Sequence, residues 1–219
     1  MLSFEEIRNN AAINIYIAQA DLTLNALGFT EHSFAHVTKV AETAANILSQ
    51  LGFSERKIEL AKIAGYMHDI GNIVNRLEHA QSGAVMAFRI LDKLNMPPED
   101  IATVVTAIGN HDEGSGIPVN PVAAALILAD KSDVRRSRVR GTDEFNFDIH
   151  DRVNFSVISS KLVIEKENKV IRLVMEIDTK YGSVMDYFEI FLERMVLCRK
   201  AAERLEMSFK LEINNQQLI

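Results

Sequence analysis

The stretch Met67-His68-Asp69-Ile70-Gly71 places an imidazole beside a carboxylate at a point where a helix meets a glycine. Four more candidate metal ligands lie far from it along the chain: His36, His79, His111 and Asp130. Imidazole and carboxylate groups suit iron, manganese or zinc, and four histidines with two aspartates are more ligands than one ion needs. We therefore predict a site for two metal ions.

On both sides of this stretch, apolar residues recur at the spacing of amphipathic helices. Gly28 and Gly52 mark the ends of two such segments, and Ser54 has the position of an N-cap for the segment that runs to Met67. The sequence predicts helices over residues 4–27, 31–50, 55–67, 79–94, 98–110 and 121–134. Each candidate ligand then lies in one of these helices or at its end, and ligands on converging helices are a common way to hold two ions.

Near residue 150 the apolar pattern changes to a two-residue alternation, which is typical of strands. Val153, Phe155 and Val157 begin the first alternating segment, and residues 171–177 form the second. A polar turn at residues 166–169 separates them, so this part of the sequence predicts a hairpin.

A helix with one apolar face is predicted over residues 184–205, and a third strand over 207–213. The fold class that we expect is mainly α. A helical domain over residues 1–148 is followed by a small α+β unit over 149–219, in the order β-β-α-β, with one helix on an antiparallel sheet.

The composition is that of a globular protein, with 219 residues, 47% of them apolar, and a formal net charge of −6. This negative balance argues against charge-driven binding to nucleic acid, which needs a basic face. The first residues, MLSFEEIRNN, include two Glu where a secretory peptide has basic residues, and no apolar run approaches the length of a membrane span. We therefore expect a cytoplasmic protein with no membrane and no bulk nucleic acid as partner. The single cysteine, Cys198, is expected to be a buried apolar side chain.

Three pieces of the sequence, in order, resemble the HD superfamily of metal-dependent phosphohydrolases. They are His36 in its apolar helix, the pair His68-Asp69, and Asp130 between Ala129 and Lys131. The superfamily motif is a distant His, an adjacent His-Asp pair and a later Asp, and the resemblance covers about residues 25–137. It implies an HD-domain helical bundle and an enzyme that hydrolyses a phosphate ester or anhydride through a metal-activated water.

His79 and His111 resemble the two additional ligands of the dinuclear branch of this superfamily, which includes HD-type diadenosine tetraphosphate hydrolases. By this resemblance, Asp69 bridges the two ions. The remaining ligands would be His36, His68 and Asp130 for one ion, and His79 and His111 for the other.

Two departures from related patterns bear on the mechanism. Asn72 stands where HD hydrolases often have Lys, and an amide can donate a hydrogen bond but cannot carry charge. The HD-GYP branch has a second His after the one equivalent to His111, where this chain has Asp112, and its Gly-Tyr-Pro motif is also missing. Membership of the HD-GYP branch is therefore not expected.

Further candidates lie in the basic run after the last ligand. Lys131, together with Asp69, is a candidate catalytic residue, and Arg135 and Arg136 are candidates to bind phosphoryl oxygens of the substrate. The alternative is that this run is a solvated helix end favoured by the helix dipole. Asp133 is expected to orient Lys131 or a ligand histidine.

His32 lies one helical turn before His36 and could bind substrate or support a ligand, although an exposed or merely packed histidine is the more common case. Asn72 is a further candidate for substrate binding. His150 is expected to be structural or exposed.

The function that these residues favour is a metal-dependent phosphohydrolase acting on a phosphorylated small molecule, with a nucleotide-like substrate expected. Its cofactors would be two divalent ions, with iron or manganese favoured and zinc or magnesium also suited to the ligands. Two other classes remain open: a mixed-valent diiron oxygenase, because some HD proteins use a similar ligand set for that chemistry, and a non-catalytic metal-bound sensor or binding module. A homodimer also remains open, because the strand over 207–213 could pair with a second subunit.

Overall fold

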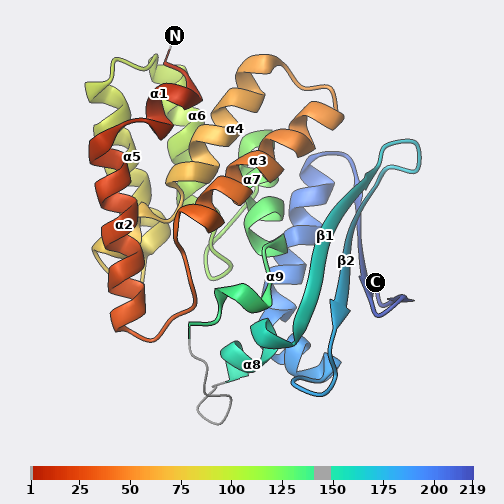
Figure 1. The fold of residues 1–219 in the computed structure, drawn as a ribbon. Helices are drawn as coiled ribbons and strands as arrows, with labels where there is room; N and C mark the ends of the chain where they lie inside the picture. The colour runs from red at the N-terminus through yellow and green to blue at the C-terminus, as the bar shows by residue number, and fades with distance from the viewer. Residues whose placement is uncertain (1, 141–148) are drawn as a thin grey trace.

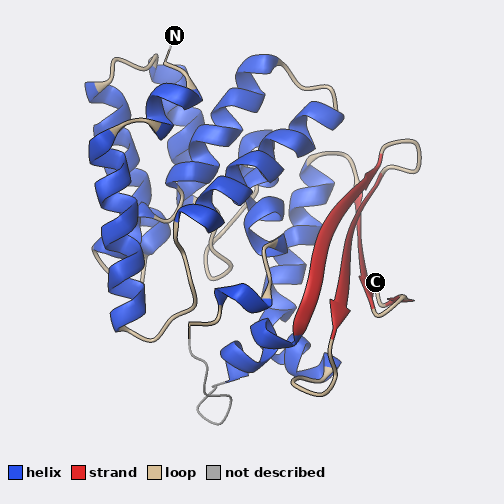
Figure 2. Ribbon diagram, viewed as in Figure 1, coloured by secondary structure: helices blue, strands red, loops and turns tan. Residues whose placement is uncertain are grey.

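Helices fill one side of the molecule and a small sheet lies on the other in the computed structural model, which describes residues 2–140 and 149–219 (Figure 2). The predicted fold class is confirmed, because a helical bundle is followed by a small unit of helices and strands. None of the helices in the described ranges combines the length and the apolar character needed to cross a bilayer.

The N-terminal segment contains two helices, α1 (Phe4–Arg8) and α2 (Ala11–Ala26). The prediction of one helix over residues 4–27 was wrong at this point. Asn10 starts a new helix, since its side-chain oxygen accepts hydrogen bonds from the first free backbone amides of α2, including that of Ala12 at 3.0 Å.

Five helices form the part of the bundle that carries the candidate ligands, and their predicted positions are confirmed to within three residues. Gly28 and Gly52 have φ angles of 81° and 80°, as glycines that end helices commonly do. After each of them a backbone amide bonds back across the last turn, as in the 2.9 Å bond from Phe29 N to Leu24 O. The five helices are α3 (Phe34–Gln50), α4 (Glu55–Met67), α5 (His79–Lys93), α6 (Pro98–Gly109) and α7 (Pro121–Ser132), with a short 3₁₀ helix, η1 (Ile70–Ile73), between α4 and α5.

The central helix of the molecule is α7, in which every residue from Val122 to Ala129 is buried. It packs against α3, α4, α6 and the long helix α9 (Val184–Arg204) (Figure 1). A helix that is covered by other helices on several sides is expected to be apolar around most of its surface. A close crossing brings α4 against α3 at Gly65, where a Cβ atom would lie only 2.7 Å from Cα of Ala41. The ends of these closely packed helices converge on one region, and Asp130 lies there in the last turn of α7.

The segment after residue 148 begins with a helix, α8 (Ile149–Ser156), and the first strand, β1 (Val157–Glu165), follows it directly. The prediction that Val153 and Phe155 belong to the strand was wrong. Both Val153 and Val157 are buried and lie one helical turn apart, so in a short segment their spacing fits a helix as well as a strand.

The sheet has the order β1-β2-β3-β4. β1 pairs antiparallel with β2 (Val170–Ile177), whereas β2 pairs parallel with β3 (Ser208–Ile213). The prediction of a purely antiparallel sheet was therefore wrong: α9 carries the chain back along the sheet, so β3 runs in the direction of β2. The short β4 (Gln216–Gln217) covers the last two residues of β3, and a homodimer stays a prediction.

The long helix α9 joins the sheet to the bundle, because it contacts both α7 and β3. Tyr187, Phe191 and Met195 are buried in this layer and belong to one cluster of apolar side chains that includes residues of both parts of the chain. The division at residues 148 and 149 stays a prediction. Cys198 is buried in the same layer, and burial raises the pKa of its thiol to about 12, as suits an unreactive apolar side chain.

Candidate metal centre

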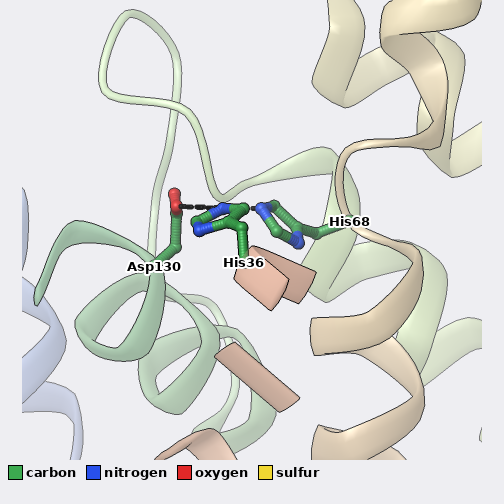
Figure 3. Close-up of side chains that lie close together, drawn as sticks. All are labelled: His36, His68 and Asp130. Carbon is green, nitrogen blue, oxygen red and sulfur yellow. Dashed lines mark ion pairs between the residues drawn. The ribbon is translucent and has the colours of Figure 1, made fainter. Parts of the chain in front are cut away.

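The six predicted ligands converge from five separate helix ends or turns. His36 lies in the first turn of α3, His68 and Asp69 follow α4, His79 begins α5, His111 follows α6 and Asp130 lies in the last turn of α7. The four histidines and Asp69 are buried, and the Asp130 side chain is 12% exposed. Figure 3 shows three of them, His36, His68 and Asp130, with their donor atoms directed toward one another.

The carboxylate of Asp69 stands in the middle of the four imidazoles and presents one oxygen to each pair. Oδ2 lies 3.6 Å from Nε2 of His36 and 3.1 Å from Nε2 of His68. Oδ1 lies 3.5 Å from Nε2 of His79 and 3.9 Å from Nε2 of His111. A carboxylate in this arrangement can bind two ions at once, one through each oxygen.

A second carboxylate closes the pair formed by His36 and His68. Oδ1 of Asp130 lies 3.4 Å from Nε2 of His36 and 3.7 Å from Nε2 of His68 (Figure 3). Ligand atoms that surround an ion at about 2.0–2.2 Å are about 3.0–3.5 Å apart. The separations in this group are therefore those of ligands that can share one ion.

All four ligand histidines have the same ring orientation. In each, Nδ1 faces an acceptor outside the cluster: Asp133 Oδ2 for His36 (2.8 Å), Gly65 O for His68 (2.8 Å), Arg76 O for His79 (3.1 Å) and Ile108 O for His111 (2.6 Å). A carbonyl or carboxylate oxygen only accepts hydrogen bonds, so Nδ1 carries the proton and Nε2 keeps its lone pair for the cluster.

Three of the inward-facing atoms have no hydrogen-bond partner among the described residues, and Nε2 of His79 has only Arg76 as a donor, 3.4 Å away. Among the described residues, Nε2 of His36, Nε2 of His68 and Oδ2 of Asp69 are buried without a hydrogen bond. The Nε2 atoms of His79 and His111 face each other at 3.1 Å, although both rings hold their protons at Nδ1. Buried polar atoms are rarely left without a partner, and facing lone pairs repel, so this donor set fits bound cations.

The electrostatics of the cluster favour ionised carboxylates and a cation between them. Burial alone raises the pKa of Asp69 and Asp130, but His68 beside Asp69 and Lys131 beside Asp130 bring both pKa values well below the usual range. Burial alone lowers the pKa of His68, but the two carboxylates raise it to about 10. The same negative potential attracts metal cations. For His79 and His111, burial lowers the pKa, which keeps them in the neutral form that binds metal.

Asp133 supports the site from outside. Its Oδ2 accepts the Nδ1 proton of His36, while its Oδ1 accepts from Lys39 at 2.7 Å and from Arg135 at 3.0 Å. Asp133 was expected to orient either Lys131 or a ligand histidine, and in the structure it bonds to the ligand histidine His36.

Asp133→Asn protein is expected to bind metal about 10–100-fold more weakly, with little change in folding. Lys39 and Arg135 would attract the amide oxygen, so the amide NH₂ would face Nδ1 of His36 and move the ring proton to Nε2, the metal-binding atom. Competition with a chelator of known affinity measures the effect, and Asp92→Asn at an exposed position is the matched control. Equal affinities for the two variants would contradict this role.

A cavity of about 370 Å³ opens onto the cluster, and the ligands Asp69, His79, His111 and Asp130 line it. Cationic side chains from four segments also face it: Arg76, Lys131, Arg138 and Arg194. Leu27, Phe29 and Phe191 give it an apolar part, and the first turns of α8 contribute a polar wall with His150, Asp151 and Asn154. The size is within the range of small-molecule sites.

Lys131 is buried and its ammonium group is paired with carboxylates on both sides, 2.8 Å from Asp130 Oδ2 and 2.6 Å from Glu113 Oε2. Glu113 in turn accepts from Nε of Arg194 at 2.7 Å. This chain of charges connects α9 to a candidate ligand. Burial alone lowers the pKa of Lys131, but Asp130 and Glu113 give a net rise, so Lys131 remains an ammonium ion.

The other predicted substrate residues lie in different surroundings. His32 lines the cavity and its Nδ1 bonds to Thr30 O at 2.7 Å. Asn72 is fully buried and donates to Oδ1 of Asp69 at 2.9 Å, so it holds the central carboxylate and is not part of the cavity wall.

Arg135 and Arg136 were predicted to bind substrate, and the structure places neither on the described cavity wall. Arg135 pairs with Asp133 and with Glu31, and Arg136 lies over the Phe155 ring with its guanidinium carbon 4.5 Å from the centroid. The physical reason is that the helix ends at Ser132, so the residues after it leave the helical face that points to the site.

Several cavity residues were not predicted. Glu113 follows the ligand His111 by two positions, and Arg194 is a charged residue next to buried Met195 on the apolar face of its helix. Both residues could therefore have been recognised as candidates from the sequence. Arg138 lies in the same basic run as Arg135, and only the path of the chain distinguishes them. His150 is exposed, as expected, and it also lines the cavity.

Comparison with known proteins agrees with this geometry. The family model described as "HD domain" matches residues 33–135. This segment is similar to HD domains. All six candidate ligands lie within it, and the predicted resemblance is confirmed at the level of the domain.

Two further proteins are similar to this chain. The chain is 24% identical over 203 residues to the uncharacterized protein MJ1020 of Methanocaldococcus jannaschii, which covers 82% of this chain and 77% of that protein. A crystal structure of a predicted HD superfamily hydrolase from an uncultured Thermotogales bacterium is 24% identical, with a TM-score of 0.46, and the match covers 57% of this chain and 67% of that one.

Proposed function

We propose that this protein is a metal-dependent phosphohydrolase with two divalent ions, which cleaves a phosphate ester or anhydride of a nucleotide-like substrate. The observation that carries the proposal is the position of Asp69, whose two oxygens face two different pairs of imidazoles that are all held in the metal-binding tautomer. The similarity to HD domains supports the same class of chemistry, and HD-type diadenosine tetraphosphate hydrolases offer one functional analogy.

His36, His68, Asp69 and Asp130 would hold one ion, and Asp69, His79 and His111 the other. When bound, such a pair supplies a water activated for attack at neutral pH and positive charge for the phosphoryl oxygens. The mixed imidazole and carboxylate donors favour iron or manganese, with zinc or magnesium also suited to them.

The residues around the ligands set their positions. Asn72 holds Oδ1 of Asp69, and Lys131 holds Oδ2 of Asp130, which leaves Oδ1 of Asp130 facing His36 and His68. The sequence predicts a catalytic role for Lys131. Because its charge is shared by Asp130 and Glu113, we propose that it positions Asp130 and does not move a proton itself.

Arg76 is a cation that lies beside His79, a ligand of the second ion, and it can bind an anionic group of the substrate. Nη1 of Arg76 lies 3.4 Å from Nε2 of His79, and no carboxylate of the described residues lies within ion-pair distance of it. A guanidinium binds phosphoryl oxygens through two parallel hydrogen bonds, so Arg76 suits the phosphoryl group that reacts. His32 holds a proton at Nδ1, so its Nε2 can accept a hydrogen bond from a substrate hydroxyl.

Metal-loaded protein should release phosphate from at least one member of a panel of phosphorylated nucleotides and sugars, under anaerobic conditions with Mn²⁺. A chelator should abolish the release, and added metal should restore it. Oxygen consumption that needs a reduced iron pair, without phosphate release, would instead support an oxygenase. Bound metal with neither activity would support a sensor or binding module.

A further inference from the structure

Arg138 is a buried cation that faces the cavity from outside the HD domain. Its side chain is held by two backbone carbonyls, with Nε 2.8 Å from Glu31 O and Nη1 2.8 Å from Asp133 O. The residue is 5% exposed, and no carboxylate of the described residues lies within ion-pair distance of its guanidinium. Its Nη2 makes no hydrogen bond within the described part of the chain.

Two other cations of the cavity already have carboxylate partners. Lys131 lies between Asp130 and Glu113, and Arg194 bonds to Glu113. A charge that is removed from water without an opposite charge is costly, so an unpaired buried guanidinium with a free nitrogen is a natural site for an anion.

Arg138 and Arg76 reach the cavity from different places. Arg76 precedes α5 and lies next to the ligand His79. Arg138 donates a hydrogen bond to the backbone carbonyl of Asp133, the residue whose side chain supports His36. A cavity of about 370 Å³ exceeds what one phosphoryl group requires, so it has room for a second anionic group beside the first.

We infer that Arg138 binds a second phosphate of the substrate, so that the site selects compounds with a phosphate besides the phosphoryl group that is cleaved. This inference rests on the proposed function for the reacting end of the molecule. Arg138 is a specificity residue in this scheme, because it touches the substrate away from the reacting bond.

Binding of two phosphonates that cannot be hydrolysed tests the inference: methylphosphonate, with one anionic group, and methylenediphosphonate, with two. Calorimetry uses the full chain with Mn²⁺ in saturating excess in both solutions. Wild-type protein is expected to bind methylenediphosphonate at least about tenfold more tightly than methylphosphonate, as one added charge-assisted contact provides. In Arg138→Gln protein this preference should disappear, while the Kd for methylphosphonate changes less than about twofold. Arg89→Gln removes an exposed arginine and should leave both Kd values unchanged.

Arg138→Lys serves as a second variant in case loss of the two carbonyl contacts impairs folding, and thermal unfolding of both variants shows whether it does. Lysine keeps the charge, so part of the preference should remain. Equal Kd values in wild-type protein, no binding of either phosphonate, or an unchanged preference in both Arg138 variants would overturn the inference. If the preference falls as expected but no phosphorylated compound is ever hydrolysed, the proposed function fails and the anion site stands.

Discussion

Asp69→Ala protein is expected to lose phosphate-releasing activity by at least about a thousandfold and to bind neither ion stably. Each oxygen of this carboxylate faces a different pair of imidazoles, so its removal deprives both ions of a ligand in one step. The space between the four buried imidazoles would then lack the negative charge that balances the bound cations.

Elemental analysis of the purified variant, together with a phosphate-release assay, measures these losses. Asp69→Asn keeps the shape and one oxygen, so it should retain more metal than Asp69→Ala, and Asp92→Ala at an exposed position is the control. Thermal melting separates the roles of the ions, since an unfolded variant would indicate that metal holds the fold. A stable and fully active Asp69→Ala protein would falsify the proposed bridge.

Gly71→Ala is expected to lower the free energy of unfolding by about 3 kcal/mol or more. A Cβ atom at this position would lie 2.0 Å from O of His79 and 2.4 Å from N of Gly83, and both are backbone atoms that cannot rotate away. The substitution must therefore push η1 away from the start of α5 and move His79 from the other ligands.

Chemical denaturation measures this loss, and metal affinity should fall with it. Gly109→Ala is a matched control, because its added Cβ would meet only the Ala84 Cβ at 3.5 Å, an ordinary contact, and its stability should change by less than about 1 kcal/mol. Similar stability of the two variants would contradict the close approach at Gly71.

The features that could be predicted from the sequence are those with a local signal. Helical spacing of apolar residues gave the positions of α3 to α7, and the pair His68-Asp69 at the end of α4 identified the centre of the cluster. The ligand roles of His79 and His111 came from a family resemblance, and the structure brings both beside Asp69.

The features that could not be predicted depend on the path of the chain. Period-two alternation is the same for parallel and antiparallel strands, so it could not reveal that β3 runs parallel to β2. In the basic run after α7, Arg135 and Arg138 are alike in sequence. Only the turn after Ser132 decides that Arg138 faces the cavity while Arg135 pairs with Asp133 and Glu31.

More than half of the described residues that line the cavity lie outside the segment similar to HD domains, on the segment around Phe29, at Arg138, and on α8 and α9. The candidate metal ligands and most of the other residues that line the cavity are thus encoded in separate stretches of the gene. Over evolution, the outer stretches can diversify and change which molecules are accepted while the ion-binding centre is conserved. For protein engineering, the same arrangement makes Phe191 and Asn154 the first positions at which to alter selectivity.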